Sequence, residues 1–572
     1  MIPRALLVAL CLGALLAPAA AAQTPGSTPT STPTDPNALS VPATMDRPPV
    51  NHVLTGDKAI AIANRQPKVI DTKRHHKGTY ARAFLKGKDR WQISYYDPRQ
   101  DNKEVAQVII NDSSGQVTEA WTGFQVAWTM ARGYAGAFGR KINAVWLWVP
   151  LCLLFFVPFF DRRRPFRMLH LDLLVLLGFS VSLAFFENAN IGMSVPLAYP
   201  LLAYVLARML WVGFRRKVGG DPLSREPIRL LVPASWLAVA VVFLIGFRVG
   251  LNVTNSNVID VGYSGVIGAD HLIGGKDVYN AFPTDNQHGD TYGPVNYYAY
   301  VPGTLIWPWS GKWDDLPAAH FTAVWFDLGT MLLLWLLGRR IRGPTLGIAL
   351  AYGWAAFPFT LFTLESNAND SLVAMLVVLS LLVVRWPAAR GATGALAGLS
   401  KFGPLGLAPL LATYDAARER VTLRPRVVVP FLAAFAATAV VVLLPVFFTK
   451  GGLHTFYDRT LGYQGGRGSP FSIWGLYGGL GFPQAAVKIG GLVLALLVAF
   501  VPRRRDVVTL AALGAAVIVA LEAGITHWFY LYIVWFFPLV LVALLGRYGE
   551  PGAAPPEPAA VPAQEERTPV PA

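Results

Sequence analysis

Cysteine is almost absent from this chain, with two among 572 residues. Cys11 lies in a short apolar stretch near the N-terminus and Cys152 in a longer one, so neither a disulfide framework nor a cysteine-based metal site is available. Acidic residues are also few, 34 against 49 Lys and Arg, which leaves a formal net charge of +15. Because the arginines gather in short clusters at the ends of apolar runs, we expect a membrane protein and no nucleic-acid partner.

Apolar residues are abundant instead, at 53% of the chain. Runs that approach the ~20 residues needed to cross a bilayer recur from residue 143 onward and predict a polytopic α-helical protein of the plasma membrane. We expect about eleven spans, at 143–160, 168–186, 191–214, 228–250, 317–338, 344–362, 371–384, 426–447, 485–501, 507–525 and 528–545. An extracytoplasmic N-terminus then places the arginine clusters inside and the C-terminus in the cytoplasm, as the positive-inside rule requires.

The ends of the chain differ from this membrane part in composition. Residues 1–22 predict a signal peptide, because Arg4 precedes a short apolar core and three alanines follow at 20–22. Residues 23–50 are rich in Pro, Thr and Ser and predict a disordered tether. Residues 548–572, rich in Pro and Ala, predict a disordered cytoplasmic tail.

Residues 51–125 predict a small exported α+β domain. Lys58 to Arg65 has helical character, Trp91–Tyr96 and Val105–Ile110 have the pattern of strands, and Asn111–Gln116 predicts a turn. A helix, a strand with a central Trp and the run "VIINDSSGQV" together resemble a single PepSY-like domain. That resemblance implies a peptide or protein partner, or regulation, while an exported spacer without a partner remains the alternative.

The segment 391–414 is apolar enough to cross the membrane, yet basic residues flank both of its ends. A full crossing places one of those clusters outside. A re-entrant pair of short helices, broken near Lys401, keeps both clusters inside, and such breaks are tolerated where they line a cavity. Two ordinary spans with a weaker charge rule remain the alternative.

On this topology the polar loops share the outer face, and the longest of them begins near Asp260. We expect an amphipathic helix over 258–275 that lies in the membrane interface, with Ile259, Val266, Ile267 and Ile273 toward lipid. Asp260 then stands at the start of that helix, where the helix dipole favours a carboxylate. A wet N-terminal helix carboxylate without any chemistry is the plain alternative for this residue.

Three motifs add to this placement: "DVGYSGVIGADHLIGGKDVY" followed by "YGPVNYYAYVPG", then "ESNANDSLVAML", then "GALAGLSKFGPLGLAPLL". Their order resembles the GT-C membrane glycosyltransferases, and most nearly glycosyltransferase family 87, which includes polyprenyl-phosphate-mannose-dependent mannosyltransferases. The resemblance implies that 228–547 is a GT-C-like catalytic domain and that 143–227 holds three accessory spans. In the family the aspartate normally follows the first span, whereas here three additional spans and a soluble domain come before the span at 228–250 that leads to Asp260.

The resemblance also implies a reaction. A sugar, mannose or another hexose, moves from a polyprenyl-phosphate donor to a lipid or cell-envelope glycan acceptor outside the membrane, and Asp260 is the general base. The residues expected to bind the substrates are Tyr263, Tyr279, Tyr292, Asn367, Asp370, Lys401, Arg467 and His527. We expect no metal and no cofactor, because no acidic or histidine spacing in the loops matches a metal site.

Two other classes of function remain open. A lipid or glycolipid transporter, or flippase, suits broken helices and buried charge. A membrane sensor suits the PepSY-like domain, but it leaves the acidic outer loops unexplained.

Overall fold

The computed structural model describes residues 39–133, 138–215, 228–314, 316–415, 424–501 and 506–548. The expected signal peptide, most of the tether and nearly all of the C-terminal tail lie outside the described residues. The chain divides into two compact units, Met1–Ala127 and Trp128–Ala572.

The first unit contains an antiparallel sheet of five strands in the order β1-β2-β3-β4-β5. Its core joins apolar residues of alternate strand positions, such as Trp91, Ile93 and Tyr95, to Ala59 and Val69 of the helices. The elements are β1 (Leu39–Ser40), α2 (Gly56–Asn64), α3 (Pro67–His75), β2 (Tyr80–Lys86), β3 (Arg90–Asp97), β4 (Lys103–Asn111), β5 (Val117–Thr122) and α4 (Phe124–Ala127).

Trp91 and Asp112 hold the segment that precedes α2 against the sheet. The indole Nε1 of the fully buried Trp91 donates to Asp112 Oδ1 at 2.8 Å. The same carboxylate accepts from the backbone N–H groups of Val53 and Leu54 at 2.7 and 3.0 Å. The expected turn therefore ties the segment before α2 to the end of β4.

The second unit is helical, and the described residues contain seven helices that are long and apolar enough to cross a membrane. These are α6 (Met168–Glu187), α7 (Ile191–Arg215), α8 (Ala234–Asn255), α11 (Pro317–Arg342), α17 (Pro425–Phe448), α21 (Gly481–Phe500) and α22 (Val507–Gly524). An eighth candidate is the bent pair α12 (Pro344–Ala356) and α13 (Pro358–Glu365), whose axes differ by 57°. The protein is thus a multi-pass helical membrane protein.

Three of the expected spans are short helices: α5 (Val145–Phe156), α14 (Asp370–Leu382) and α23 (Ile533–Leu545). At 12 or 13 residues each, they extend roughly 20 Å, less than the ~30 Å of a hydrocarbon core. The total of about eleven spans therefore stays a prediction.

Residues 387–412 form two short helical pieces. α15 (Pro387–Gly398) is followed by an irregular stretch at 399–402, then by the 3₁₀ helix η6 (Gly403–Leu407) and α16 (Ala408–Ala412). The buried Arg390, near the start of α15, donates through Nη2 to the carbonyl oxygen of Tyr414 at 2.8 Å, just after α16 ends. The two ends of the segment 390–414 therefore lie close together, and its re-entrant path through the membrane stays a prediction.

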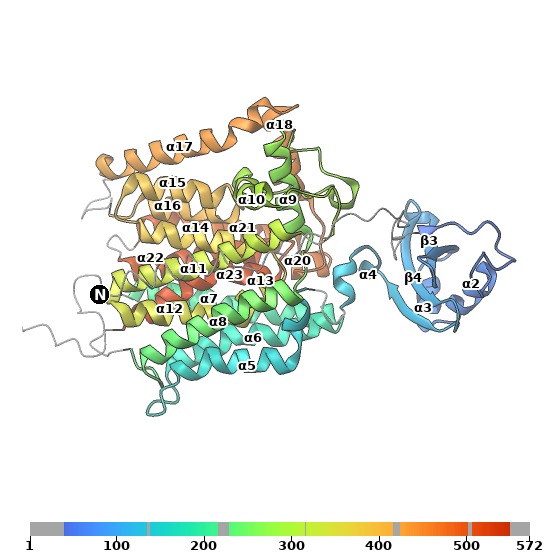
Figure 1. Ribbon diagram of the computed structural model, residues 1–572, viewed down its shortest axis with the longest axis horizontal. Helices are drawn as coiled ribbons and strands as arrows, with labels where there is room; N and C mark the ends of the chain where they lie inside the picture. The colour runs from blue at the N-terminus through green and yellow to red at the C-terminus, as the bar shows by residue number, and fades with distance from the viewer. Residues whose placement is uncertain are drawn as a thin grey trace, which may run out of the picture. The chain divides into compact units, whose positions relative to one another are not determined.

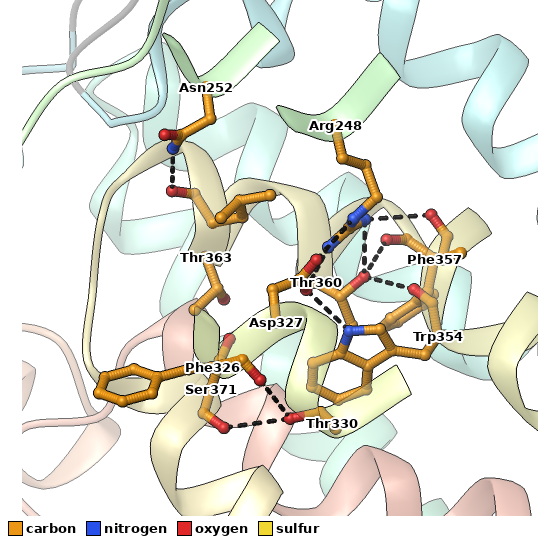
Figure 2. A network of polar contacts seen from close by, with 12 residues as sticks. Arg248, Asn252, Phe326, Asp327, Thr330, Trp354, Phe357, Thr360, Thr363 and Ser371 are labelled. Carbon is orange, nitrogen blue, oxygen red and sulfur yellow. Dashed lines mark hydrogen bonds and ion pairs between the residues drawn. The ribbon is translucent and has the colours of Figure 1, made fainter. Parts of the chain in front are cut away.

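A buried polar network joins α8, α11, α12 and α13 (Figure 2). Arg248, which has no exposed surface, donates to Asp327 through Nε at 3.0 Å and Nη2 at 2.5 Å. Its Nη1 donates to Ala355 O at 3.0 Å, and Trp354 Nε1 donates to Asp327 Oδ1 at 2.8 Å. The bidentate pair satisfies both charges and holds the bend between α12 and α13 against α8.

The long helices lie side by side, with α9, α10, α18 and α20 at one end of the bundle (Figure 1). The elements at this end are α9 (Asp260–Ile273), η5 (Thr284–Asn286), α10 (Pro294–Ile306), α18 (Gly452–Tyr457), a π-helical turn (Asp458–Gly462), α19 (Tyr463–Gly466) and α20 (Ile473–Leu476). The remaining short 3₁₀ helices are η1 (Pro98–Gln100), η2 (Thr129–Arg132), η3 (Arg140–Asn143), η4 (Val157–Phe159) and η8 (Tyr530–Tyr532).

The helix α9 begins at Asp260 as expected, but its apolar side does not face lipid. Ile259, Val266 and Ile267 are buried inside the protein, and of the four residues expected toward lipid only Ile273 is well exposed, at 45%. The lipid-facing expectation was therefore wrong for three of them. The reason is close packing with α10: a Cβ placed on Gly268 would lie 2.1 Å from the ring of Tyr297.

Candidate functional site

Asp260 is the first residue of α9, directly after its N-cap Ile259. The residue is exposed at the surface. Desolvation by the surrounding protein nevertheless raises the pKa of its carboxyl above the usual range. The positive charges of Arg467 and Lys401 act in the opposite direction and lower this pKa. Because water reaches this carboxylate, we expect the shift to be smaller than for an enclosed group. Asp260 therefore combines access to a ligand with proximity to two cations.

Lys401 lies in the irregular stretch between α15 and η6 and is 7% exposed. Its Nζ donates to Asp370 Oδ1 at 2.6 Å, and Trp535 Nε1 donates to the same oxygen at 2.8 Å. The ring centroids of Tyr292, Trp535 and Tyr532 lie 5.2, 5.4 and 5.5 Å from Nζ. An ion pair and three aromatic rings thus hold the ammonium group in a largely buried position.

Local backbone contacts bring this stretch to α10. The N–H groups of Gly293 and Val295 donate to the carbonyl oxygens of Ser400 and Leu399 at 3.2 and 3.1 Å. A Cβ placed on Gly293 would lie 1.9 Å from Leu399 O, so only glycine permits this approach. The start of α10 therefore fixes the position of Lys401.

Arg467 and His527 come from two other segments of the chain. The Arg467 guanidinium lies over the rings of Trp128 and Tyr463, at 5.4 and 5.9 Å, and in the described part of the chain its buried Nε has no hydrogen-bond partner. His527 Nδ1 lies 2.9 Å from Ser469 Oγ. Burial, together with the charges of Arg467 and Lys401, holds the pKa of His527 well below its usual value, so this imidazole is neutral at pH 7.

The loop that carries Arg467 is tied to the loop between α9 and α10. Arg459 donates to the buried Asp290 through Nε at 2.6 Å and Nη2 at 2.8 Å, and also to the carbonyl oxygen of Gln287. Gln464 Nε2 donates to Thr291 Oγ1 at 2.7 Å. These contacts join residues some 170 positions apart in the sequence and place Arg467 near α9.

Six of the nine expected residues therefore lie in one region, where the charges of Asp260, Asp370, Lys401 and Arg467 influence one another or their shared neighbours. They are Asp260, Tyr292, Asp370, Lys401, Arg467 and His527. Sequence reasoning did not single out Tyr532, Trp535 or Trp128 as members of this region, and it did not predict the pairing of Asp290 with Arg459.

The other three residues are engaged with protein partners. The fully buried Tyr263 donates to Asp285 Oδ2 at 3.2 Å and stacks on Trp313 with ring centroids 5.0 Å apart. Tyr279 donates to Tyr292 O at 3.0 Å and packs against Phe456. These two tyrosines therefore pack against other residues of the protein beside the region.

Asn367 supports the start of α9. It is fully buried, with a positive φ of 49° that asparagine tolerates. Its Nδ2 donates to Ser256 Oγ and Asn257 O, both at 3.0 Å, and its Oδ1 accepts from Asn252 Nδ2 at 3.0 Å. These bonds hold the chain that leads into Asp260.

Among the described residues, no three His, Cys, Asp or Glu side chains group as a metal site would require. The expectation of no metal stays a prediction. No family model matches this chain, and no curated protein matches it. The resemblance to family 87 therefore rests on the residue patterns alone.

Proposed function

We propose that the protein is a membrane glycosyltransferase that moves a hexose, such as mannose, from a polyprenyl-phosphate donor to an extracytoplasmic lipid or envelope glycan. The observation that carries the proposal is the meeting of an accessible carboxylate, Asp260, with two cations, Lys401 and Arg467, from segments far apart in the sequence. A transfer of this kind needs one base and one anion-binding group on opposite sides of a reacting sugar.

In the proposed reaction Asp260 accepts the proton of the acceptor hydroxyl as its oxygen attacks the anomeric carbon. The bond between that carbon and the phosphate oxygen breaks, and the lipid phosphate leaves with the electron pair. A single displacement inverts the anomeric centre. A phosphate leaving group needs stabilisation of negative charge rather than a strong general acid.

The two cations are unequal partners for that phosphate. The charge of Lys401 is already compensated by Asp370 at 2.6 Å, whereas Arg467 Nε has no hydrogen-bond partner among the described residues. Arg467 is therefore the principal phosphate ligand in this proposal, and Lys401 contributes a weaker, fixed field. The neutral His527 contributes at most a hydrogen bond.

The test is product formation by purified protein in proteoliposomes. Polyprenyl-phosphate-mannose labelled in the sugar is supplied with a membrane lipid extract as acceptor. A new labelled glycoside, formed with release of polyprenyl phosphate, supports the proposal. Movement of the labelled lipid between leaflets without any new glycosidic bond contradicts it.

That second outcome identifies the alternative function, a lipid or glycolipid transporter. Buried charge within the long helices favours it, because ionisable groups at membrane depth often mark a transport path. Arg248 and Asp327 form one such buried pair. In a second pair, Arg208 of α7 donates to the buried Asp172 of α6 at 2.8 Å. Both pairs are bidentate and internally satisfied, so they support a structural role at least as well as a path for substrate.

A further inference from the structure

A cavity of about 200 Å³ lies between the C-terminal ends of α11 and α14 and the N-terminal end of α22. It is far from Asp260, since α14 separates the two sites: Asp370 is its first residue, and Leu381 and Leu382, about 20 Å away along the helix, line the cavity. None of the nine expected site residues lines it.

Positive charge dominates this cavity. Its lining includes three arginines, Arg340, Arg342 and Arg385, against a single carboxylate, Asp506. Asp506 already caps α22, because its Oδ1 accepts from Thr509 N at 2.7 Å. The cavity is therefore suited to an anion, and the planar guanidinium group matches the geometry of a phosphate.

Two of these arginines, Arg340 and Arg385, have N–H groups that make no hydrogen bond within the described part of the chain. Arg340 uses Nη1 to reach Leu382 O at 2.7 Å, and its guanidinium lies 4.8 Å from the centre of the Trp386 ring. These contacts fix its position and leave Nε and Nη2 without a hydrogen bond in the described part of the chain. Arg385 is exposed and has neither a hydrogen bond nor an ion pair among the described residues. Two guanidinium groups at the cavity are thus available to one ligand.

The rest of the lining is apolar, with Leu337, Leu381 and Val384 among the buried residues. α11 and α22, whose ends frame the cavity, are both candidate membrane spans. A ligand held here therefore meets guanidinium groups beside hydrocarbon at the end of a membrane helix. Basic pockets of this kind between membrane helices suit the head groups of anionic lipids.

We propose that this cavity is a binding site for the phosphate head group of an anionic membrane lipid, separate from the transfer site. The lipid joins the ends of α11, α14 and α22 and so stabilises the folded helical unit by mass action.

The chain offers a matched control at the same end of the bundle. Arg339 is the neighbour of Arg340, but its guanidinium lies over Trp335 at 4.6 Å, and Arg547 lies over Tyr548 at 5.6 Å. Neither lines the cavity. The double variant Arg339→Gln/Arg547→Gln removes two charges, as Arg340→Gln/Arg385→Gln does.

The experiment measures lipid retention by native mass spectrometry on the full-length protein, released from nanodiscs of phosphatidylcholine with graded phosphatidylglycerol. We expect wild type and the control to retain phosphatidylglycerol, and Arg340→Gln/Arg385→Gln to retain it about 30-fold more weakly, at ~1 kcal/mol for each arginine near an anionic lipid surface. Equal retention by all three proteins overturns the proposal.

Two further measurements keep the test decisive if the double variant folds poorly. Wild type alone is compared in phosphatidylcholine and in phosphatidylglycerol, and equal retention of the two lipids also overturns the proposal. Inorganic phosphate is then titrated into wild type in phosphatidylcholine while thermal unfolding is followed. Stabilisation by phosphate as strong as that by phosphatidylglycerol overturns the lipid assignment in favour of a soluble anion.

Discussion

The buried ion pair of Lys401 and Asp370 leads to a specific prediction about the free energy of unfolding. Replacement of Asp370 by Asn keeps the shape of the side chain and the bond from Trp535 Nε1, but it leaves the Lys401 ammonium group, 7% exposed, without its counter-ion at 2.6 Å. Removal of one member of a buried pair costs about 3–5 kcal/mol. Because three ring faces lie within 5.5 Å of Nζ, we expect the lower part of that range.

The double variant Asp370→Asn/Lys401→Met behaves differently in this account. It removes both charges, and a buried ion pair replaced as a whole is often neutral for stability. We expect its free energy of unfolding to lie within about 1.5 kcal/mol of wild type. Lys401→Met leaves the buried Asp370 unpaired and is expected to cost about 3 kcal/mol as well, so the coupling energy between the two positions is about 4.5 kcal/mol.

The assay is reversible unfolding in mixed micelles by titration with SDS, carried out on wild type, both single variants and the double variant. Far-ultraviolet circular dichroism and tryptophan fluorescence report the transition, and coincident curves justify a two-state analysis. A double variant as unstable as the sum of its single variants would refute the reasoning, because the pair would then have no energetic link.

Three more predictions follow from residues near the site. Asn367→Ala lowers the free energy of unfolding by about 1–3 kcal/mol, because Asn252 and Ser256 lose a buried hydrogen-bond partner. The transfer rate per folded molecule changes little, and a variant that loses transfer rate without losing stability contradicts this prediction. Gly293→Ala lowers the yield of folded protein, since the new Cβ meets Leu399 O, whereas Gly192→Ala, with nothing within 4 Å, does not; size-exclusion chromatography compares the two. The rate falls on acidification at a pH above the ~3.9 of an ordinary aspartate, because a base must be ionised and the pKa of Asp260 is raised; a rate that is constant down to pH 4 contradicts this.

The raised pKa of Asp260 has a second consequence, for stability. A carboxyl whose pKa is higher in the folded state binds more protons there, so its contribution to stability falls as pH rises from the unfolded to the folded value. At a pH above the pKa in the folded state the ionised group destabilises the fold, so there we expect Asp260→Asn to unfold at a slightly higher SDS concentration than wild type.

In the first unit the sequence pattern predicted part of the fold. The expected helix and the two strands correspond to α2, β3 and β4 within two residues at each end. α3 was missed because Pro67–His75 carries mostly polar and charged residues, and its stability comes from the burial of Val69 and Thr72 against the sheet. β2 was missed because Arg and Lys interrupt its apolar alternation.

In the helical unit apolar runs predicted where helices lie but not how they bend or which face they bury. Residues 344–362 were expected as one span, yet Pro358 begins a new helix after Phe357 and the axis turns. Periodicity found the bounds of α9 but not its surroundings, since a buried apolar face and a lipid-facing one have the same pattern.

At the candidate site the sequence identified charges in unusual settings, such as Lys401 within an apolar segment. It did not identify Tyr532 and Trp535 around that charge, because aromatic residues at the end of a span are ordinary in membrane proteins. It also missed the pairing of Asp290 with Arg459, which depends on the fold bringing two distant loops together.

The measurement that tests the account most directly is the single-turnover rate of sugar transfer by purified Asp260→Asn in proteoliposomes. The control is Asp270→Asn, a carboxylate on the same helix that faces Lys276 at 3.5 Å. We predict that Asp260→Asn transfers sugar about 10²–10⁴-fold more slowly than wild type, and that Asp270→Asn stays within about threefold of it, as expected for the loss of a weak exposed ion pair. A rate for Asp260→Asn equal to that of the control would contradict the role of Asp260 as the general base.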